Sequence, residues 1–364
     1  MVGVAALRGY VLEELLARLL YDNGYRLLVS EDQDPEALKR GAHGLLVRGR
    51  GADHQADVLG ELTLPVPFSL PVRIFVEAKY RSRKTGLFDV RNAHGVVHDV
   101  NEQFSTAAAG ARAIPVRRYH YRYTLFSTSG FTKPAQQFAL AQQISLVDLS
   151  SPAFARLLVV ADRAARQLLT LAQATQTTSF PTGQVRSAFR LALGTWTADT
   201  FPDRQVGAER GGRAVFASEV NPARREPHQL PDYQLAEITE DLGGWESGRL
   251  LLGFPAAPFV LALRPDDPAA FSDYVREHGP DVPVHIEFAR RREVTGDWVI
   301  VPAREPSAFT LRFALPELLE DWLLGDERAA ALRARDVKSG LFSSIAVFQD
   351  GRVIRLLFQP RRRG

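Results

Sequence analysis

The stretch VRIFVEA, residues 72–78, is the strongest strand signal in the chain, and it decides how the first half folds. Nearly every member is apolar, which is typical of a strand buried on both faces of a sheet. The run ends in Glu77-Ala78 and Lys79 follows, so two charged side chains stand at the end of a buried strand. Because side chains alternate along a strand, residues 77 and 79 point to the same face. We expect this strand at the centre of a layered domain, with charge at one end.

Helices and strands alternate on both sides of this stretch. Leucines recur at helical spacing between Gly9 and Tyr21, and Asn23-Gly24 ends that helix. Further helices are expected at 88–109, 134–143 and 152–174, and strands at 25–29, 55–62, 123–127 and 144–149. This order predicts an α/β fold, with a three-layer N-terminal domain built on a central mixed sheet.

The second half of the chain has a different pattern. At 364 residues, two domains are expected from a usual size of roughly 150 residues each. The polar segment TQTTSFPTG, residues 175–183, reads as a linker between domains 1–174 and 184–364. Short strands are expected at 215–220, 250–252, 259–263, 284–288, 298–301, 309–313, 345–348 and 352–358, and helices at 268–278 and 316–334. We expect a C-terminal α+β domain that serves recognition, regulation or partner docking.

The composition excludes several classes of protein. With 45% hydrophobic and 24% charged residues the chain is not mainly disordered. No apolar run approaches the roughly 20 residues that cross a bilayer, so we expect no membrane span. The first residues lack the features of a signal peptide, and we expect a cytoplasmic protein. The absence of cysteine excludes disulfides, thiolate metal sites and cysteine nucleophiles, while a net charge of +3 permits an anionic partner without requiring one.

Asp57, Glu77 and Lys79 form the constellation that points to chemistry. A hairpin through the Pro-rich connection 65–71 can bring Asp57 beside Glu77. Two adjacent carboxylates repel each other, and a divalent cation relieves that repulsion; oxygen ligands favour Mg²⁺ or Mn²⁺. Such a metal polarises a phosphate and lowers the pKa of a bound water. Lys79 is one of only five lysines among 45 basic residues, and arginine, being broad and never neutral, would replace it badly in positioning that water.

Four segments around these residues resemble the PD-(D/E)xK nuclease superfamily, in particular its Mrr-like restriction endonuclease branch, over about residues 7–160. They are LEELLARLLYDNGY (12–25), GADHQADVLG (51–60), FVEAKY (75–80) and YTLFSTSGFTKPAQQFALAQQISLVDLS (123–150). Many Mrr-like members differ in carrying Gln at the position of Glu77 and a Gly-Gly or Gly-Ile pair before the aspartate.

The resemblance implies a restriction-endonuclease-like fold for the N-terminal domain and roles for single residues. Asp57, Glu77 and the carbonyl of Ala78 would hold Mg²⁺, for which Mn²⁺ can substitute. Lys79 would be the catalytic lysine, and Glu13 the acidic residue of the opening helix that supports the metal.

Further polar residues are candidates for contacts with nucleic acid. Arg81, Arg83 and Lys84 follow the catalytic strand and can contact backbone phosphates, although a solvated loop explains them nearly as well. Ser129 and Thr132 can donate hydrogen bonds to phosphates near the site.

The histidines are weaker candidates. His54 can reach the metal site or a phosphate, or be an ordinary loop histidine. His94 and His98 have helical metal-ligand spacing, but no third ligand accompanies them in the sequence.

These observations predict a metal-dependent DNA endonuclease in prokaryotic defence, whose cutting the C-terminal domain directs or gates. Besides DNA, a homodimer, an activating nucleotide and a defence-system partner protein are the partners considered. One alternative is a catalytically silent nuclease-like subunit for DNA binding or assembly; the intact set of Asp57, Glu77 and Lys79 counts against it. The other is an RNA-cutting toxin, because nothing in the sequence distinguishes ribose from deoxyribose.

Overall fold

The computed structural model describes residues 2–41, 44–64, 69–103, 105–109, 112–116, 118–177, 179–195, 230–243, 250–257, 259–289, 297–324 and 327–361. The helices are α1 (Val4–Asp22), α2 (Leu87–Asn101), α3 (Lys133–Gln142), α4 (Ala155–Ala174), α5 (Thr182–Ala192), α6 (Asp232–Gly243), α7 (Pro268–His278), α8 (Glu317–Leu324) and α9 (Glu327–Gly340). Within these ranges, no helix has the length and apolar character needed to cross a membrane. The strand expected at 215–220 lies outside the described residues.

The strands are β1 (Tyr25–Leu27), β2 (Leu38–Gly41), β3 (Gly44–Arg48), β4 (Asp53–Gln55), β5 (Val58–Leu62), β6 (Val72–Lys79), β7 (Ser105–Ala109), β8 (Arg112–Val116), β9 (His120–Ser127), β10 (Ser145–Asp148), β11 (Leu251–Pro255), β12 (Leu261–Pro265), β13 (Asp281–Ala289), β14 (Asp297–Pro302), β15 (Leu311–Phe313), β16 (Ser344–Gln349) and β17 (Arg352–Phe358). Five of them form the central sheet of the N-terminal part, in the order β1-β5-β6-β9-β10. The pairs β1–β5 and β5–β6 are antiparallel, and β6–β9 and β9–β10 are parallel. The sheet is therefore mixed, as predicted.

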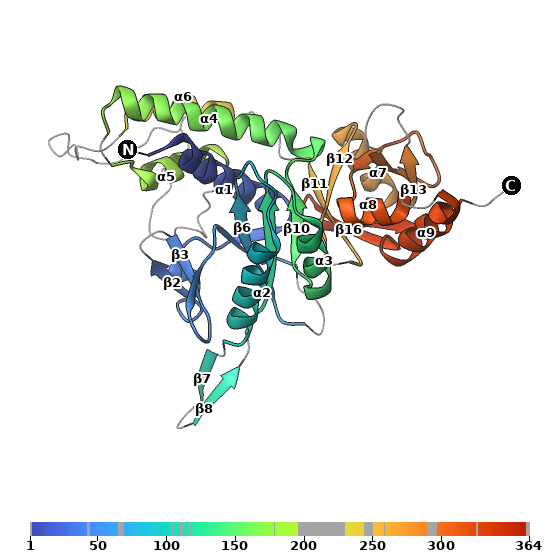
Figure 1. Cartoon of the computed structure of the whole chain (residues 1–364), viewed down its shortest axis with the longest axis horizontal. Coiled ribbons are helices and arrows are strands. Elements are labelled where there is room, and N and C mark those ends of the chain that lie inside the picture. The colour runs from blue at the N-terminus through green and yellow to red at the C-terminus, as the bar shows by residue number, and fades with distance from the viewer. Residues whose placement is uncertain are drawn as a thin grey trace.

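The apolar run VRIFVEA forms β6 at the middle of this sheet. Its Ile74 and Val76 pack into the apolar cluster with α1 and α4, whereas Phe75 packs into the cluster with α2 and α3. Figure 1 shows these two helix pairs on opposite faces of the sheet. An apolar strand between two helical layers is what its composition requires, and the predicted three-layer α/β architecture is confirmed.

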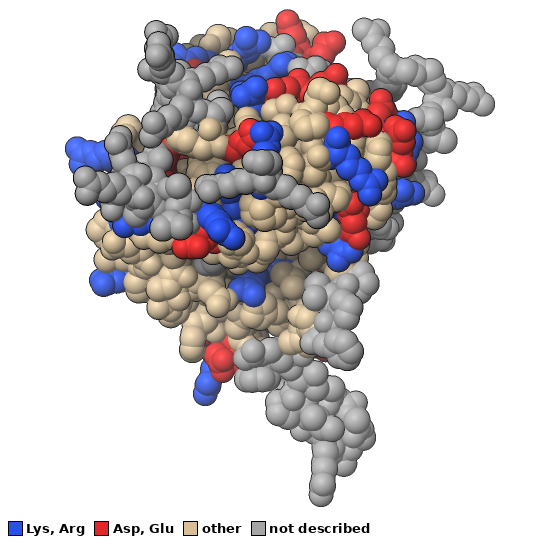
Figure 2. All heavy atoms as spheres, turned by 90° about the vertical axis from the view of Figure 1, so that its right-hand side faces the viewer, with Lys and Arg blue, Asp and Glu red and all other residues tan. Residues whose placement is uncertain are grey.

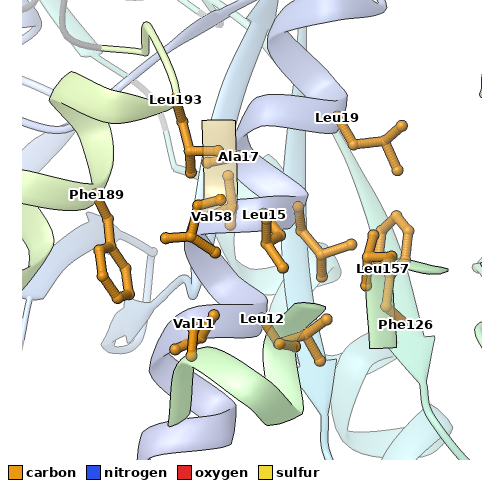
Figure 3. Packing of buried hydrophobic residues seen from close by; sticks show 14 of the residues in the cluster. Val11, Leu12, Leu15, Ala17, Leu19, Val58, Phe126, Leu157, Phe189 and Leu193 are labelled. Atoms are coloured by element: carbon orange, nitrogen blue, oxygen red, sulfur yellow. The ribbon is translucent and has the colours of Figure 1, made fainter. Parts of the chain in front are cut away.

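Helices α5 and α6 extend the layer made by α1 and α4. Phe189 of α5 and Leu193 at its C-terminal end belong to the same apolar cluster as Val58 and α1 (Figure 3). Helix α6 packs against α4 and α5 in that cluster. The segment 175–183, expected as a domain linker, thus leads from one helix of this core into another. Polar residues with Pro and Gly occur in turns between helices as well as in linkers between domains. The division into domains 1–174 and 184–364 therefore stays a prediction.

The C-terminal part contains a closed barrel in the strand order β11-β12-β15-β14-β13-β17-β16, with α7, α8 and α9 beside it. Side chains fill its interior: Trp298 is 2% exposed, and its ring lies 6.2 Å from Phe313 and 6.4 Å from Phe342. Asp350 and Gly351 have φ values of 49° and 75° in the turn between β16 and β17, as the Asp-Gly pair predicts. The expected C-terminal α+β class is confirmed.

Two predicted helices are wrong in extent. The helix expected at 88–109 ends at Asn101, and Ser105–Ala109 instead pairs with Arg112–Val116 as a two-stranded sheet. The alanines of this segment favour a helix locally, but a weak propensity yields to pairing between strands. The helix expected at 316–334 is two helices, α8 and α9.

The end of α1 connects the N-terminal part to the barrel. The side-chain oxygen of Asn23 accepts a hydrogen bond from the backbone of Leu252 at 2.8 Å. Gly24 has a φ of +84°, and a Cβ there would lie 2.6 Å from the ring of Phe348. Asn23-Gly24, predicted only as a helix stop, therefore also makes the contact with β11 and β16.

Candidate active site

Asp57 and Glu77 lie together at the ends of two paired strands. Val58 of β5 pairs with Val76 of β6, and the backbone N–H of Asp57 donates to the carbonyl of Val76 at 3.1 Å. The antiparallel register therefore sets Asp57 opposite Glu77. A carboxylate oxygen of Asp57 also accepts from the backbone N–H of Ala78 at 2.7 Å. The structure thus brings together the two carboxylates singled out in the sequence.

Glu77 is held between two partners. Its Oε1 forms an ion pair with the ammonium of Lys79, on the same face of β6. Its Oε2 accepts a hydrogen bond of 2.6 Å from the hydroxyl of Tyr123, on the neighbouring strand β9. The ring of Tyr123 stacks on Phe75 with 4.8 Å between centroids. Sequence reasoning missed this role of Tyr123, because the contact depends on a parallel pairing between strands 46 positions apart.

Glu13 approaches from α1 on the other side of Asp57. Both residues line a cavity of about 660 Å³ that α1, the start of β5, the small β2–β3–β4 sheet and α5 enclose. The carboxylate of Glu13 forms an ion pair with Arg186 of α5. Four charged residues that the sequence predicts for the site therefore lie near one another: Glu13, Asp57, Glu77 and Lys79. Arg186, which the sequence reasoning did not consider, lies beside them.

Residues 4–158 match the family model of the Mrr catalytic domain, described as a restriction endonuclease. Over these residues, the chain is therefore similar to Mrr-like PD-(D/E)xK nuclease domains. A solved structure titled "Crystal Structure of Protein of Unknown Function AF1548" is 18% identical to the chain, with a TM-score of 0.26. That match covers 40% of this chain and 60% of the other. No curated protein matches the sequence.

The carboxylates of this Mrr-like site carry more negative charge than their surroundings neutralise. Burial raises the pKa of Asp57; the hydrogen bond from Ala78 opposes this, and the charge of Glu77 raises it further. Burial likewise raises the pKa of Glu13 to about 7, with Arg186 opposing and Asp57 adding to the shift. Burial is the larger effect at both carboxyls, and the nearby Lys79 and Arg186 offset it only in part.

A magnesium ion fits this donor set. Within the described part of the chain, no group of three or more His, Asp or Glu side chains is placed to hold a metal. Mg²⁺, however, commonly binds through one or two carboxylates together with waters and substrate phosphates. Asp57 and Glu77 supply two such carboxylates side by side, and the raised pKa of Asp57 is that of a carboxylate in need of a cation. These two residues would hold Mg²⁺ or Mn²⁺.

The residues predicted to contact DNA lie beside the Mrr-like site, and several have partners within the protein. In the loop after β6, Arg81 pairs with Asp89 at 3.1 Å and Lys84 with Glu317 at 2.7 Å, while Arg83 is exposed. The Ser129 hydroxyl donates to the carbonyl of Arg83.

Thr132 is at the N-terminal end of α3, and its backbone N–H donates to the carbonyl of Thr85 at 3.0 Å. The Ser/Thr-Gly loop, residues 127–132, therefore fastens the loop after β6, and phosphate contacts by Ser129 and Thr132 stay a prediction.

His54 points away from the two carboxylates of the Mrr-like site. Its Nε2 lies 2.7 Å from Oδ2 of Asp99 on α2. The backbone N–H groups of Gly51 and Ala52 donate to Oδ1 and Oδ2 of the same carboxylate. These contacts fasten the turn between β3 and β4 to α2. His94 and His98 have their ring centroids 6.4 Å apart and meet no third metal-ligating side chain among the described residues.

Proposed function

We propose that this protein is a metal-dependent DNA endonuclease, cytoplasmic and acting in prokaryotic defence. The observation that carries the proposal is the meeting of Asp57, Glu77 and Lys79 at the end of the central strand of an Mrr-like domain. An unbalanced pair of carboxylates beside a lysine is the arrangement that phosphodiester hydrolysis with a hard divalent cation requires.

Each side chain has a distinct role in this proposal. Asp57 and Glu77, with the Ala78 carbonyl, would hold Mg²⁺, which would polarise the phosphate and lower the pKa of a bound water. Tyr123 orients Glu77 through its hydroxyl. Lys79, held near the site by its ion pair with Glu77, orients the attacking water and offsets the negative charge that develops on the phosphate. Glu13 supports the metal or its waters from α1.

We further propose that the C-terminal part gates cutting through α8, which packs against α3. The carboxylates of Glu317 and Asp321 on α8 pair with Lys84 and Lys133 at 2.7 and 2.6 Å. Gln136 of α3 accepts from the backbone of α8 at 3.0 Å. DNA phosphates would compete with these acidic side chains for the lysines beside the site.

The remaining barrel face does not suggest a second surface for DNA. Figure 2 shows basic and acidic side chains intermixed on the described part of the face that the barrel presents. A surface of mixed sign does not attract a polyanion as a whole. We therefore propose that cutting is controlled by α8, by an activating nucleotide or by a defence-system partner protein, and not by DNA bound to this face of the barrel. A homodimer would supply two sites for cutting both strands.

Cleavage of supercoiled plasmid DNA, with and without Mg²⁺ or Mn²⁺, tests the catalytic proposal. We expect metal-dependent cutting that Asp57→Ala and Lys79→Ala abolish. Asp53→Ala and Lys39→Ala are matched controls, because these residues form an exposed ion pair at 2.7 Å on the adjacent small sheet. Cutting that survives both site substitutions would mean that the chemistry lies elsewhere. If the protein cuts RNA but not DNA, the alternative of an RNA-cutting toxin is favoured. If it binds DNA without cutting it, the alternative of a catalytically silent DNA-binding subunit is favoured.

The gating proposal has its own test. Glu317→Gln combined with Asp321→Asn removes the competing carboxylates, and we expect several-fold faster cutting at low salt with a smaller gain at high salt. Asp273→Asn combined with Asp281→Asn removes the same charge from exposed ion pairs elsewhere on the barrel side. Equal rates for both double variants would contradict gating through α8 and leave the catalytic proposal untouched.

A further inference from the structure

Helix α5 lies outside the residues that match the nuclease family, yet it reaches the active site. Its Arg186 pairs with Glu13 and lies 3.5 Å from a carboxylate oxygen of Glu14. The side chain is 22% exposed and lines the same cavity as Asp57. A residue from beyond the family domain therefore brings a permanent positive charge to the catalytic carboxylates.

The position of Arg186 is set by packing of the helix that carries it. Val185 and Phe189 are 2% and 1% exposed and belong to the core shared with α1. Figure 3 shows Phe189 in this core. At the end of the helix, the carbonyl of Leu193 accepts a hydrogen bond from Arg18 of α1. Because α5 is fixed by these contacts, the helix that carries Arg186 is already in place before a ligand binds.

Arg190, one turn further along α5, differs in its surroundings. Its guanidinium makes two hydrogen bonds to Glu14, at 3.0 and 3.1 Å, and Glu14 is 2% exposed. This paired geometry occupies the fork of the guanidinium with a buried carboxylate. Arg190 thus has a structural role. Arg186 pairs instead with Glu13, whose side chain is 15% exposed and lines the cavity with Asp57. A guanidinium has five N–H groups, and the contacts of Arg186 with Glu13 and Glu14 account for two of them.

We propose that Arg186 contacts a phosphate of the nucleic-acid strand at the cleavage site, bridging that phosphate and the carboxylate of Glu13. The inference rests on the proposed nuclease function and adds a substrate-binding residue to it. The planar guanidinium matches phosphate oxygens through two parallel hydrogen bonds, which an ammonium cannot make. In the free protein the pairing with Glu13 holds the guanidinium in the cavity wall. When the strand enters, Arg186 adds a second cation, besides Lys79, for the negative charge that develops on the phosphate oxygens.

The salt dependence of DNA binding tests the contact without any need for cutting. A fluorescent duplex is titrated with protein in metal-free buffer over a range of KCl concentrations, and the slope of log K against log salt is compared. This slope is negative, and the loss of one phosphate contact reduces its magnitude by about 0.9. We expect that decrease for Arg186→Gln and an unchanged slope for Arg190→Gln. An unchanged slope for Arg186→Gln overturns the inference.

Cleavage rates add a second readout. With Mg²⁺ and saturating plasmid, we expect Arg186→Gln to cut about 100-fold more slowly, and Arg190→Gln to retain its rate if its thermal midpoint shows a folded protein. Arg186→Lys keeps the charge but not the fork, so it should restore the salt slope and not the rate. It also serves if Arg186→Gln fails to fold, since a lysine variant that cuts as wild type overturns the inference.

These readouts separate two kinds of failure. If wild-type protein binds and cuts DNA while the variants at Arg186 match it, the inference fails and the nuclease proposal stands. If wild-type protein binds DNA without cutting it under any metal condition, the nuclease proposal fails, and the salt slope alone decides whether Arg186 contacts phosphate.

Discussion

The two ends of strand β6 carry buried charge in opposite states. At its beginning, Arg73 is 0% exposed and donates to Asp34 at 2.7 Å and to Glu61 at 2.9 Å. Its guanidinium also lies 3.3 Å from the ring centroid of Tyr119. At the other end, the carboxylates of Asp57 and Glu77 face each other with Lys79 as the paired cation. We call the group around Arg73 the closed cluster, because its charges are paired with one another. We call Asp57, Glu77 and Lys79, together with the neighbouring Glu13, the open cluster.

The direction of the pKa shifts separates the two clusters. Burial alone would raise the pKa of Asp34, but the charge and hydrogen bond of Arg73, together with Arg118, hold it below its ordinary value. The pKa values of Asp57 and Glu13 lie above theirs. Burial of charge is common to both ends, so burial does not mark a functional site. A carboxylate that remains short of positive charge does.

The largest effect on stability is expected at the closed cluster. Arg73→Met removes the shared partner of Asp34 and Glu61 and leaves the buried carboxylate of Asp34 with the partly exposed Arg118 as its remaining cation. We expect a loss of about 3 kcal/mol of unfolding free energy, at the lower end of the range for breaking a buried ion pair. Urea denaturation measures it. Arg26→Met is the control, because Arg26 pairs with the same Glu61 at the surface with 43% of its side chain exposed. We expect a loss below about 1 kcal/mol there, and equal losses would remove the contrast between the two clusters.

The open cluster should show itself in the pH dependence of stability. The pKa of Glu13 is about 7 in the folded protein against an ordinary 4.5. Between these values the folded state binds a proton that the unfolded state has released, so stability falls as the pH rises from about 4.5 to about 7. The fall amounts to at most about 3 kcal/mol. Glu13→Gln should abolish it in metal-free urea denaturation, and a variant with the same fall as wild type would contradict the shift.

Asp57 provides a smaller test with an unusual sign. Asp57→Asn keeps an oxygen that can accept a hydrogen bond from the Ala78 N–H. It also removes the negative charge of a carboxyl group whose pKa is raised by burial and by Glu77. We expect the thermal midpoint of the metal-free protein at pH 8 not to fall and the protein to lose stabilisation by added Mn²⁺. Cutting should drop by about 100-fold or more. A large loss of stability would mean that Asp57 has a structural role, as Asp34 has in the cluster around Arg73.

The smallest effect is expected where charge is exposed. Lys84 and Glu317 pair at 2.7 Å with 51% and 46% of their side chains exposed. A double-mutant cycle with Lys84→Ala and Glu317→Ala should give a coupling of about 0.2–1 kcal/mol. The coupling should weaken in 1 M salt, where the Debye length falls to about 3 Å. A larger or salt-resistant coupling would mean that α8 holds the loop after β6 more firmly than this geometry implies.

Local pattern was enough to predict much of the fold and part of the site. The apolar run of β6, the leucine stripe of α1 and the Asp350-Gly351 turn all act within a few residues, and the structure has each in its expected form. The alanine-rich stretch 105–109 shows the limit, because its helical preference is weak and pairing with β8 overrides it. Glu77 and Lys79 were predictable as neighbours since strand alternation fixes which face they share.

The remaining features of the site depend on residues far apart in the chain. Tyr123 reaches Glu77 across 46 positions, and Arg186 reaches Glu13 across 173. No periodicity or spacing connects such pairs, because only the order of strands and the packing of α5 on α1 bring them together.

By itself, the sequence determined the layered α/β class, the Mrr-like segments and the charged side chains Glu77 and Lys79 at the end of a buried strand. The tertiary structure decided which charges along that strand find partners. Arg73 meets two carboxylates and a tyrosine ring, while Asp57 and Glu13 retain raised pKa values despite Lys79 and Arg186. The physical reason is that the energy of a buried charge depends on every group within a few ångströms, and distant elements of the chain supply those groups.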